Sequence, residues 1–421
     1  MHKDSYMKEA KILIIGLVWP EPGSSAAGTR MIQLIKFFLT GGFEVIFASA
    51  AAKGEFSFNL SAIGVNEETI RLNDSSFDDF IRELSPSHVL FDRFMVEEQY
   101  GWRVQQQCPA AIRILDTEDL HCLRHARQQI VRTGNVFKPA DLFTDMAKRE
   151  LASIWRSDLS LIISEIEMDL LQRQFRVDPS LIYYLPFLEE RLTEESRSVW
   201  KSFEERRDFV FIGNFLHEPN WHTVQVLKTK VWPSLRKRLP DAHMNIYGAY
   251  AGQKVLQLHN ERERFMVHGR AEDAIQVVGD ARVLLAPIQF GAGVKGKFID
   301  AMRTGTPSVT TTVGAEAMKG NLEWNGAIAD ELDAFVDQAF RLYEDKISWQ
   351  KAQNNGLRII NERYSKAAYE DDFKLRLEDL AVSLTTQRHH NFFGQVLLHH
   401  TTNSSKYMSL WIQEKNRNKG I

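Results

Sequence analysis

The sequence is poor in cysteine. Cys108 and Cys122 are the only two among 421 residues, too few for a disulfide framework, so the fold must rest on buried apolar side chains. The first ten residues are polar and lack the apolar core of a secretory signal peptide. The cytoplasm is therefore the compartment that we expect.

The sequence also lacks long apolar runs and an excess of charge of one sign. One of the longest runs, residues 11–16, falls far short of the roughly 20 residues of a membrane-crossing helix, so only peripheral attachment, such as at the inner face of the membrane, stays open. The 52 basic and 55 acidic residues give a net charge of -3. This balance offers no general attraction for nucleic acid, and we expect no such partner.

What is present is the composition of a folded, enzyme-sized protein. Of the residues, 44% are hydrophobic and 25% are charged, which is typical of globular chains. A length of 421 residues exceeds what one hydrophobic core usually organises, so we expect two domains.

Strands and helices alternate from the start of the chain. A buried strand at residues 12–15 is followed by a small-residue loop at 20–28, a helix at 29–39 and a second strand at 43–48. The alternation continues with strands at 88–91, 112–115, 159–164 and 181–185 and with helices at 77–84, 97–107 and 142–155. This pattern predicts an N-terminal Rossmann-like domain over residues 8–190.

A second alternating series follows a highly charged linker at residues 188–208. Its expected strands lie at 209–212, 244–247, 265–268, 283–286 and 308–311, and its helices at 221–239, 253–259, 273–278 and 295–303. We expect a C-terminal domain over residues 206–365 and a helical tail, 366–421, that packs back on the domains. The predicted class is α/β, with two doubly wound parallel sheets and a ligand cleft between them.

The sharpest motif is Ala286-Pro-Ile-Gln-Phe-Gly-Ala-Gly-Val-Lys-Gly-Lys-Phe-Ile-Asp-Ala-Met302, a strand, a glycine loop and a helix. Gly291 and Gly293 allow close approach of the backbone, the helix start offers free N–H groups, and Lys295 and Lys297 add positive charge. Together they predict a diphosphate site. In the competing interpretation the glycines only turn the chain and the lysines are solvated.

Asp300 lies three residues after Lys297, on the same side of the predicted helix. A carboxylate there can accept hydrogen bonds from ribose hydroxyls. The alternative is an exposed acid that merely pairs with Lys297.

Two N-terminal segments add candidates. The loop from Pro20 to Arg30 can bring backbone N–H groups, including that of Gly28, to the cleft, but its glycine spacing does not fit the dinucleotide-binding pattern, which argues against an oxidoreductase. The cluster Leu115-Asp-Thr-Glu-Asp-Leu-His-Cys-Leu-Arg124 follows a strand, where ligand-binding residues collect, although such residues also cap helices. Its spacing fits no metal site.

With these residues in view, the chain resembles the retaining glycosyltransferases of family 4, group 1 type, over roughly residues 10–365. The resemblance rests on the first loop, on the series from Phe211-Ile-Gly-Asn-Phe-Leu-His-Glu-Pro-Asn220 to His268-Gly-Arg270, and on the segment from Gly291 to Gly305-Thr-Pro307. It implies the GT-B architecture, two facing Rossmann-like domains with C-terminal helices.

The resemblance also implies a reaction and the residues that carry it. A sugar moves, with retention, from a nucleotide-sugar donor to a hydroxyl of a glycan, lipid or protein acceptor, and no metal or other cofactor is required. Lys297 contacts the diphosphate, and His121, among the alternatives Glu118, Asp119 and His121, contacts the transferred sugar. The donor site implied by the resemblance and the motifs comprises Gly28, Asn214, Gly269, Arg270, Gly291, Ala292, Gly293, Lys295, Lys297 and Asp300.

Three departures from the family pattern leave alternatives open. Ala292 replaces the first glutamate of the family's E-x7-E pair, Asp300 replaces the second, and Asn214 stands where many relatives carry a basic residue. A subgroup that uses the glycine loop and Lys295 instead is the interpretation we favour. The rivals are a nucleotide-sugar epimerase of the same fold and a non-catalytic binding protein.

Overall fold

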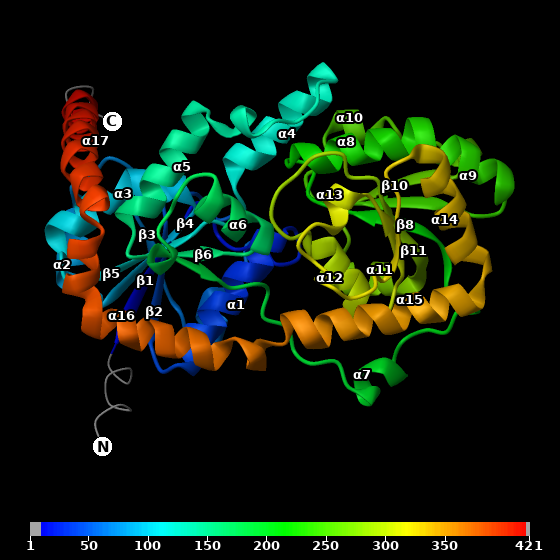
Figure 1. The fold of residues 1–421 in the computed structure, drawn as a ribbon, viewed down its shortest axis with the longest axis horizontal. Coiled ribbons are helices and arrows are strands. Elements are labelled where there is room, and N and C mark those ends of the chain that lie inside the picture. Colours follow the sequence, from blue (N-terminus) through cyan, green and yellow to red (C-terminus); the bar gives the residue numbers. More distant parts are fainter. Residues whose placement is uncertain (1–9, 418–421) are drawn as a thin grey trace.

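The computed structural model describes residues 10–417, with the side chains of residues 400–403 excepted. Two α/β domains lie side by side, and long C-terminal helices run beneath both of them (Figure 1). Each domain is built on its own parallel sheet, as the two alternating series predict.

The N-terminal sheet has seven parallel strands in the order β3-β2-β1-β4-β5-β6-β7. Their bounds are Lys11–Gly16 (β1), Glu44–Ser49 (β2), Asn66–Thr69 (β3), His88–Asp92 (β4), Ile112–Asp116 (β5), Leu159–Ile162 (β6) and Ile182–Tyr184 (β7). The order reverses beside β1, where Ile14 pairs with Phe47 on one side and with Leu90 on the other. Ligands bind at such reversal points, near the carboxyl ends of the strands.

Helices cover both faces of this sheet. They are α1 (Ala26–Thr40), α2 (Ser76–Leu84), α3 (Phe94–Gln107), α4 (His121–Thr133), α5 (Asp145–Arg156) and α6 (Glu165–Arg173), with 3-10 turns η1 (Leu60–Ile63), η2 (Pro139–Leu142) and η3 (Pro179–Leu181). The sequence analysis missed β3, α4 and α6. β3 is a polar, largely exposed edge strand, and α4 buries only Cys122, Leu123 and Ala126, so neither carries a strong apolar pattern.

The C-terminal sheet has six parallel strands in the order β10-β9-β8-β11-β12-β13. They are β8 (Arg207–Ile212), β9 (Met244–Tyr247), β10 (Phe265–Gly269), β11 (Ala281–Ala286), β12 (Ser308–Thr310) and β13 (Gly326–Ile328), the last of which the sequence analysis also missed. Its helices are α8 (Glu218–Val226), the π-helical η4 (Leu227–Val231), α9 (Trp232–Arg238), α10 (Gln253–Leu256), η5 (Glu261–Glu263), α11 (Ala274–Asp280), α12 (Gly296–Arg303), α13 (Thr312–Ala315) and α14 (Leu332–Glu344).

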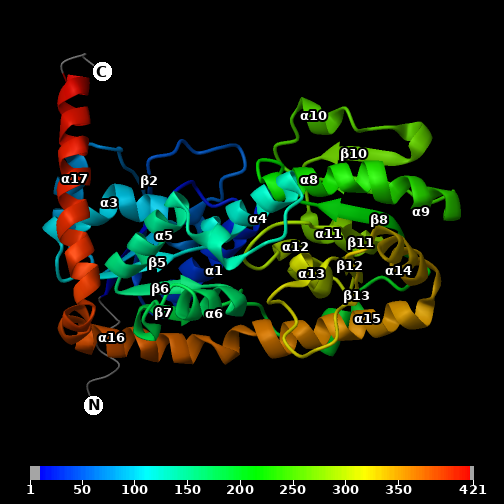
Figure 2. The same cartoon turned by 45° about the horizontal axis from the view of Figure 1, so that its top comes forward.

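The chain then returns to the N-terminal domain. α15 (Lys346–Ile359), η6 (Ile360–Tyr364) and η7 (Lys366–Ala368) lead into α16 (Glu370–His390), and α17 (Phe392–Arg417) turns up along the far side (Figure 2). Phe373 of α16 packs on Phe37 of α1, with 4.8 Å between ring centroids. None of the helices described between residues 10 and 417 combines the length and apolar character needed to cross a bilayer.

The two chain crossings between the domains lie against each other. The first crossing is the linker, which contains α7 (Glu194–Ser198). It begins beside residues 364–366, where the chain crosses back to the N-terminal domain. Glu189 donates its N–H to the carbonyl of Tyr364 at 2.7 Å, and Lys366 donates to the carbonyl of Glu189 at 2.8 Å. These bonds place both covalent connections between the domains at one point.

Candidate active site

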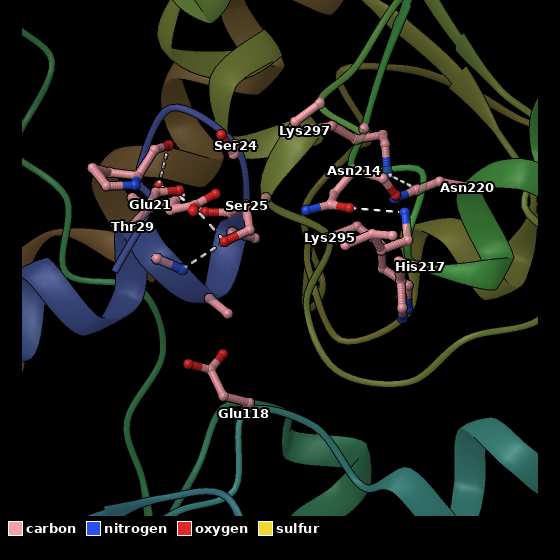
Figure 3. Close-up of a pocket in the computed structure, with 18 of the residues that line it drawn as sticks. Glu21, Ser24, Ser25, Thr29, Glu118, Asn214, His217, Asn220, Lys295 and Lys297 are labelled. Atoms are coloured by element: carbon pink, nitrogen blue, oxygen red, sulfur yellow. Dashed lines mark hydrogen bonds between the residues drawn. The ribbon is translucent and has the colours of Figure 1, made fainter. Parts of the chain in front are cut away.

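A cavity of about 520 Å³ lies between the domains. The N-terminal domain contributes the loop at residues 18–29, the end of β4 and the turn after β5. The C-terminal domain contributes the starts of α8 and α12 and the loops that precede them. Figure 3 shows Glu118 facing the cavity from one side, with Lys295, Lys297 and Asn214 on the C-terminal side.

Of the predicted site residues, most line this cavity. They are Gly28, Glu118, Asp119, His121, Asn214, Arg270, Gly291, Ala292, Lys295, Lys297 and Asp300. Gly269 and Gly293 are not among the lining residues in the described part of the chain. Gly269 has φ 75°, and its carbonyl accepts a hydrogen bond from the N–H of Gly248 at 2.7 Å. It is the last residue of β10.

Lys295 and Gly296 form the start of α12. The Lys295 side chain is buried, and its Nζ donates to the carbonyl of Gly293 at 2.9 Å. Burial lowers the pKa of Lys295 to about 8. A Cβ on Gly296 would lie 2.6 Å from the Cβ of Ala26, so only glycine lets α1 of the other domain approach this closely.

Lys297 lies in the first turn of α12. Its Nζ donates to Oδ1 of Asn220 at 3.0 Å, and Nδ2 of Asn220 donates to the carbonyl of Asn214 at 2.8 Å. Burial and the neighbouring Lys295 lower the pKa of Lys297 to about 8. The positive charges of Lys295 and Lys297 near the start of one helix favour the binding of an anion.

Asp300 lines the cavity one turn beyond Lys297. It is half-buried, unlike the exposed acid of the alternative interpretation. Burial raises its pKa to about 7, and Arg303 opposes that shift. Near neutral pH this carboxyl is therefore poised between its two protonation states.

The glycine loop, residues 291–293, is held from the other domain by two side chains that the sequence analysis missed. Gly293 donates its N–H to Oε1 of Glu167 at 2.8 Å, and Arg127 donates to the carbonyl of Gly291 at 2.8 Å. Both partners lie on helices, α6 and α4, that the sequence analysis did not predict. No local pattern marks them, because their importance depends on the other domain.

The β5–α4 turn, residues 117–120, presents two acids to the cavity. Burial opposes ionisation of Asp119, yet Arg124 holds the pKa of that carboxyl well below its usual range. Glu118 has φ 62°, a backbone conformation that costs a non-glycine residue roughly 1–3 kcal/mol. Within residues 10–417 its Oε1 is buried without a hydrogen-bond partner.

The surroundings of the Glu118 carboxyl favour its protonated form. Burial, and then the charge of Asp116, raises the pKa of Glu118 to about 8. A neutral acid can donate a hydrogen bond as well as accept one. A strained residue with an unpartnered atom beside a cavity is a strong candidate for ligand contact.

His121 is the first residue of α4, and its surroundings restrain it. Its N–H donates to Oε1 of Glu150 at 2.9 Å, and its Nδ1 lies 3.2 Å from the carbonyl of Asp119. The ring meets Phe94 edge to face, with 5.3 Å between centroids. His121 lines the cavity, and its ring contacts with Asp119, Glu150 and Phe94 all lie within the N-terminal domain.

The loop before α1 makes direct contacts across the cleft. Tyr250 donates to the carboxylate of Glu21 at 2.8 Å, and Arg270 donates to Oγ of Ser24 at 3.4 Å. The N–H of Gly28 already donates to Oγ of Ser25 at 3.0 Å, which caps α1. Since a Cβ on Gly28 would lie 2.5 Å from the backbone of Glu21, this glycine allows the loop to fold over the helix start.

The described residues contain no group of three or more His, Cys, Asp or Glu side chains arranged to hold a metal ion. The expectation that the reaction needs no metal stays a prediction.

The chain has the GT-B fold. It superposes on sucrose-phosphate synthase from Thermosynechococcus elongatus with a TM-score of 0.64 and 14% identity, covering 89% of this chain and 100% of that one. Anabaena HepE in complex with UDP and glucose gives 0.64 and 13%, covering 88% and 100%. A Staphylococcus aureus TarM mutant in complex with fondaparinux, alpha-GlcNAc-glycerol and UDP gives 0.65 and 10%, covering 89% and 99%.

Within this fold, residues 206–345 match the family described as Glycosyl transferases group 1. The C-terminal domain is thus a group 1 glycosyltransferase domain, the type that the sequence resemblance indicates. The chain is also 25% identical over 173 residues to an uncharacterized 44.6 kDa protein of the cps region of Klebsiella pneumoniae. That match covers 39% of this chain and less than half, 45%, of the relative.

Proposed function

We propose that the protein transfers a sugar from a nucleoside-diphosphate sugar to an acceptor hydroxyl, with retention of configuration. The observation that carries the proposal is the pair Lys295 and Lys297, which lie at the start of α12 in the wall of the interdomain cavity. Retention is supported by the family resemblance alone.

In the proposed reaction the bond between the anomeric carbon and the diphosphate breaks as the acceptor oxygen attacks. Negative charge develops on the leaving diphosphate, next to the two ammonium groups and the N–H groups that begin α12. Fixed donors in a site shielded from water stabilise such charge strongly, so these groups supply the stabilisation that a metal supplies elsewhere. The proton of the acceptor hydroxyl passes to an oxygen of the leaving diphosphate. The proposed reaction therefore requires no side-chain base.

The N-terminal wall binds the transferred sugar in this proposal. Glu118, with its neutral carboxyl and unpartnered Oε1, is placed to hydrogen-bond a sugar hydroxyl. His121, restrained by Glu150 and Asp119, lies beside it on the same wall. Asp300, on the opposite wall, is proposed to bind the ribose.

A donor panel tests the proposal. Thermal shift with UDP, GDP and ADP and with their common sugar conjugates should single out one nucleotide, and that donor should then lose its sugar to a hydroxyl acceptor. NMR of the product gives the anomeric configuration. Epimerised sugar from donor alone would favour the epimerase, and the lack of any nucleotide binding would favour a non-catalytic protein.

A further inference from the structure

Glu167 lies outside the cavity and is buried, with 1% of its surface exposed. It sits in the first turn of α6, where Oγ of the capping residue Ser164 accepts its N–H at 3.4 Å. Burial raises the pKa of Glu167 to about 8. A carboxyl in such a place needs hydrogen-bond partners, and those partners come from two different domains.

Oε1 of Glu167 accepts two backbone N–H groups. One comes from Leu120, at 3.1 Å, which stands between Asp119 and His121 in the N-terminal wall of the cavity. The other comes from Gly293, at 2.8 Å, in the glycine loop of the C-terminal domain. A single oxygen atom thus joins the backbone segments that form the two walls.

The fit at this junction is tight. Gly293 has φ 62°, and a Cβ there would lie 2.8 Å from the Cβ of Asp119. On the same loop, Arg127 donates to the carbonyl of Gly291 at 2.8 Å and pairs with Glu316 at 2.6 Å. The N-terminal domain therefore holds the glycine loop at both ends, by an acceptor at Gly293 and a donor at Gly291.

A rotation of one domain relative to the other would affect these two contacts differently. The bond from Leu120 lies within the N-terminal domain and survives any rotation about the paired crossings at Glu189 and Lys366. The bond from Gly293 joins the two domains and would break if the cleft opened. Opening would therefore free the glycine loop, and closing would fix its orientation relative to the β5–α4 turn.

We propose that Glu167 is a positioning residue that latches the glycine loop to the β5–α4 turn when the cleft closes, with Arg127 as the second holding contact. The inference rests on the proposed function for its effect on turnover. Closure itself is independent of chemistry, since the latch consists of contacts between the two domains. Glu167 touches no substrate in this scheme and acts only through Gly293 and Leu120.

The test compares Glu167→Ala, Glu167→Gln and a matched control, Glu150→Ala. Glu150 is equally buried and accepts the N–H groups of His121 and Cys122, but both of these belong to the N-terminal domain. Its removal disturbs the same wall without touching the glycine loop. The glutamine variant keeps an oxygen that can accept both N–H groups and should act like the parent.

Closure is measured by small-angle X-ray scattering, with and without UDP or the nucleoside diphosphate that gives the largest shift in the donor panel. The parent, Glu167→Gln and Glu150→Ala should reach the compact form with nucleotide, and Glu167→Ala should stay more open. In transfer assays Glu167→Ala should lower kcat by about 10- to 100-fold, with Kd for the nucleotide changed by no more than about threefold.

The outcomes separate the two proposals. If the parent transfers no sugar but Glu167→Ala alone fails to close, the proposed function is wrong and the latch stands. If folded Glu167→Ala closes and turns over like the parent, the latch is wrong. Should Glu167→Ala not fold, Arg127→Met must show a more open form and a lower kcat, because Arg127 holds the other end of the loop. Normal closure in that variant would overturn the proposal.

Discussion

Nζ of Lys297 donates a hydrogen bond to Oδ1 of Asn220 at 3.0 Å. Asn220 is fixed in turn, since its Nδ2 donates to the carbonyl of Asn214 and a Cβ on Gly213 would lie 2.7 Å from its Cγ. The loop after β8 thereby holds Asn220 of α8, which orients the ammonium group of Lys297 on α12. The position of this ammonium group therefore depends on α8 as well as on α12.

Removing this acceptor should weaken donor binding. In Asn220→Ala the ammonium loses its orienting partner, and we expect the nucleotide to bind about fivefold more weakly, the effect of about 1 kcal/mol. Titration calorimetry of Asn220→Ala, Lys297→Ala and the double variant measures the coupling. The double variant should bind no worse than Lys297→Ala, and additive losses would contradict the proposed orientation.

Lys297 and Asp300 should discriminate between parts of the nucleotide. Lys297→Ala removes a charge-assisted contact and should weaken nucleoside diphosphate binding by roughly 10- to 100-fold, while a nucleoside without phosphate binds as before. Asp300→Ala should weaken both ligands. If both folded variants bind donor like the parent, the diphosphate site lies elsewhere.

Donor affinity should fall as pH rises through about 8. The pKa of each lysine, Lys295 and Lys297, lies near 8 in the empty site, below the ordinary value for lysine, so both ammonium groups lose their charge above that pH. A bound diphosphate favours the charged form, so binding takes up protons and weakens between about pH 8 and 10. Calorimetry over this range should show the decline, and a phosphate-free nucleoside provides the control. A flat profile for the diphosphate would show that these lysines do not contact it.

Measurements of kcat should show which side chain of the N-terminal wall, His121 or Glu118, contacts the transferred sugar. If His121 contacts the transferred sugar, His121→Ala lowers kcat far more than nucleotide affinity. The unpartnered Oε1 of Glu118 predicts the same split for Glu118→Ala, by about tenfold for a lost hydrogen bond. Steady-state kinetics of both variants tests the assignment. Unchanged kcat in a folded variant removes that residue from the sugar contact.

Arg30 and Asp116 predict a large effect on stability. Both are fully buried. Nη2 of Arg30 donates to Oδ1 of Asp116 at 2.9 Å, and Nη1 donates to the carbonyl of Leu185 at 2.8 Å. Arg30→Met leaves a buried carboxylate unpaired, which costs about 3–5 kcal/mol. Thermal unfolding should show the loss, and Lys53→Met, at a surface ion pair with Glu67, should change stability by less than about 1 kcal/mol. Equal effects would contradict this explanation.

The class of the fold and the position of the glycine loop before α12 could both be predicted from the sequence. The apolar strands and the glycine loop before Lys295 are local signals, because burial on both faces of a parallel sheet and a turn that needs glycine each impose a pattern on neighbouring residues. For this reason β1, β2, β8 and β11 and the start of α12 lie within a residue or two of their predicted places. The polar elements β3 and α4 carry no such pattern.

The contacts between the two domains could not be predicted from the sequence, because they join segments that are far apart along the chain. Glu167 and Gly293 are 126 positions apart, and Arg127 and Gly291 are 164 apart. Nothing near Glu167 in the sequence distinguishes it from a solvated helix acid, and the tertiary fold alone buries it against the other domain. The raised pKa of Glu118 has the same origin, because burial and the charge of Asp116 are properties of the folded chain. Local sequence specifies local conformation, whereas desolvation and contacts between domains depend on the packing of distant segments.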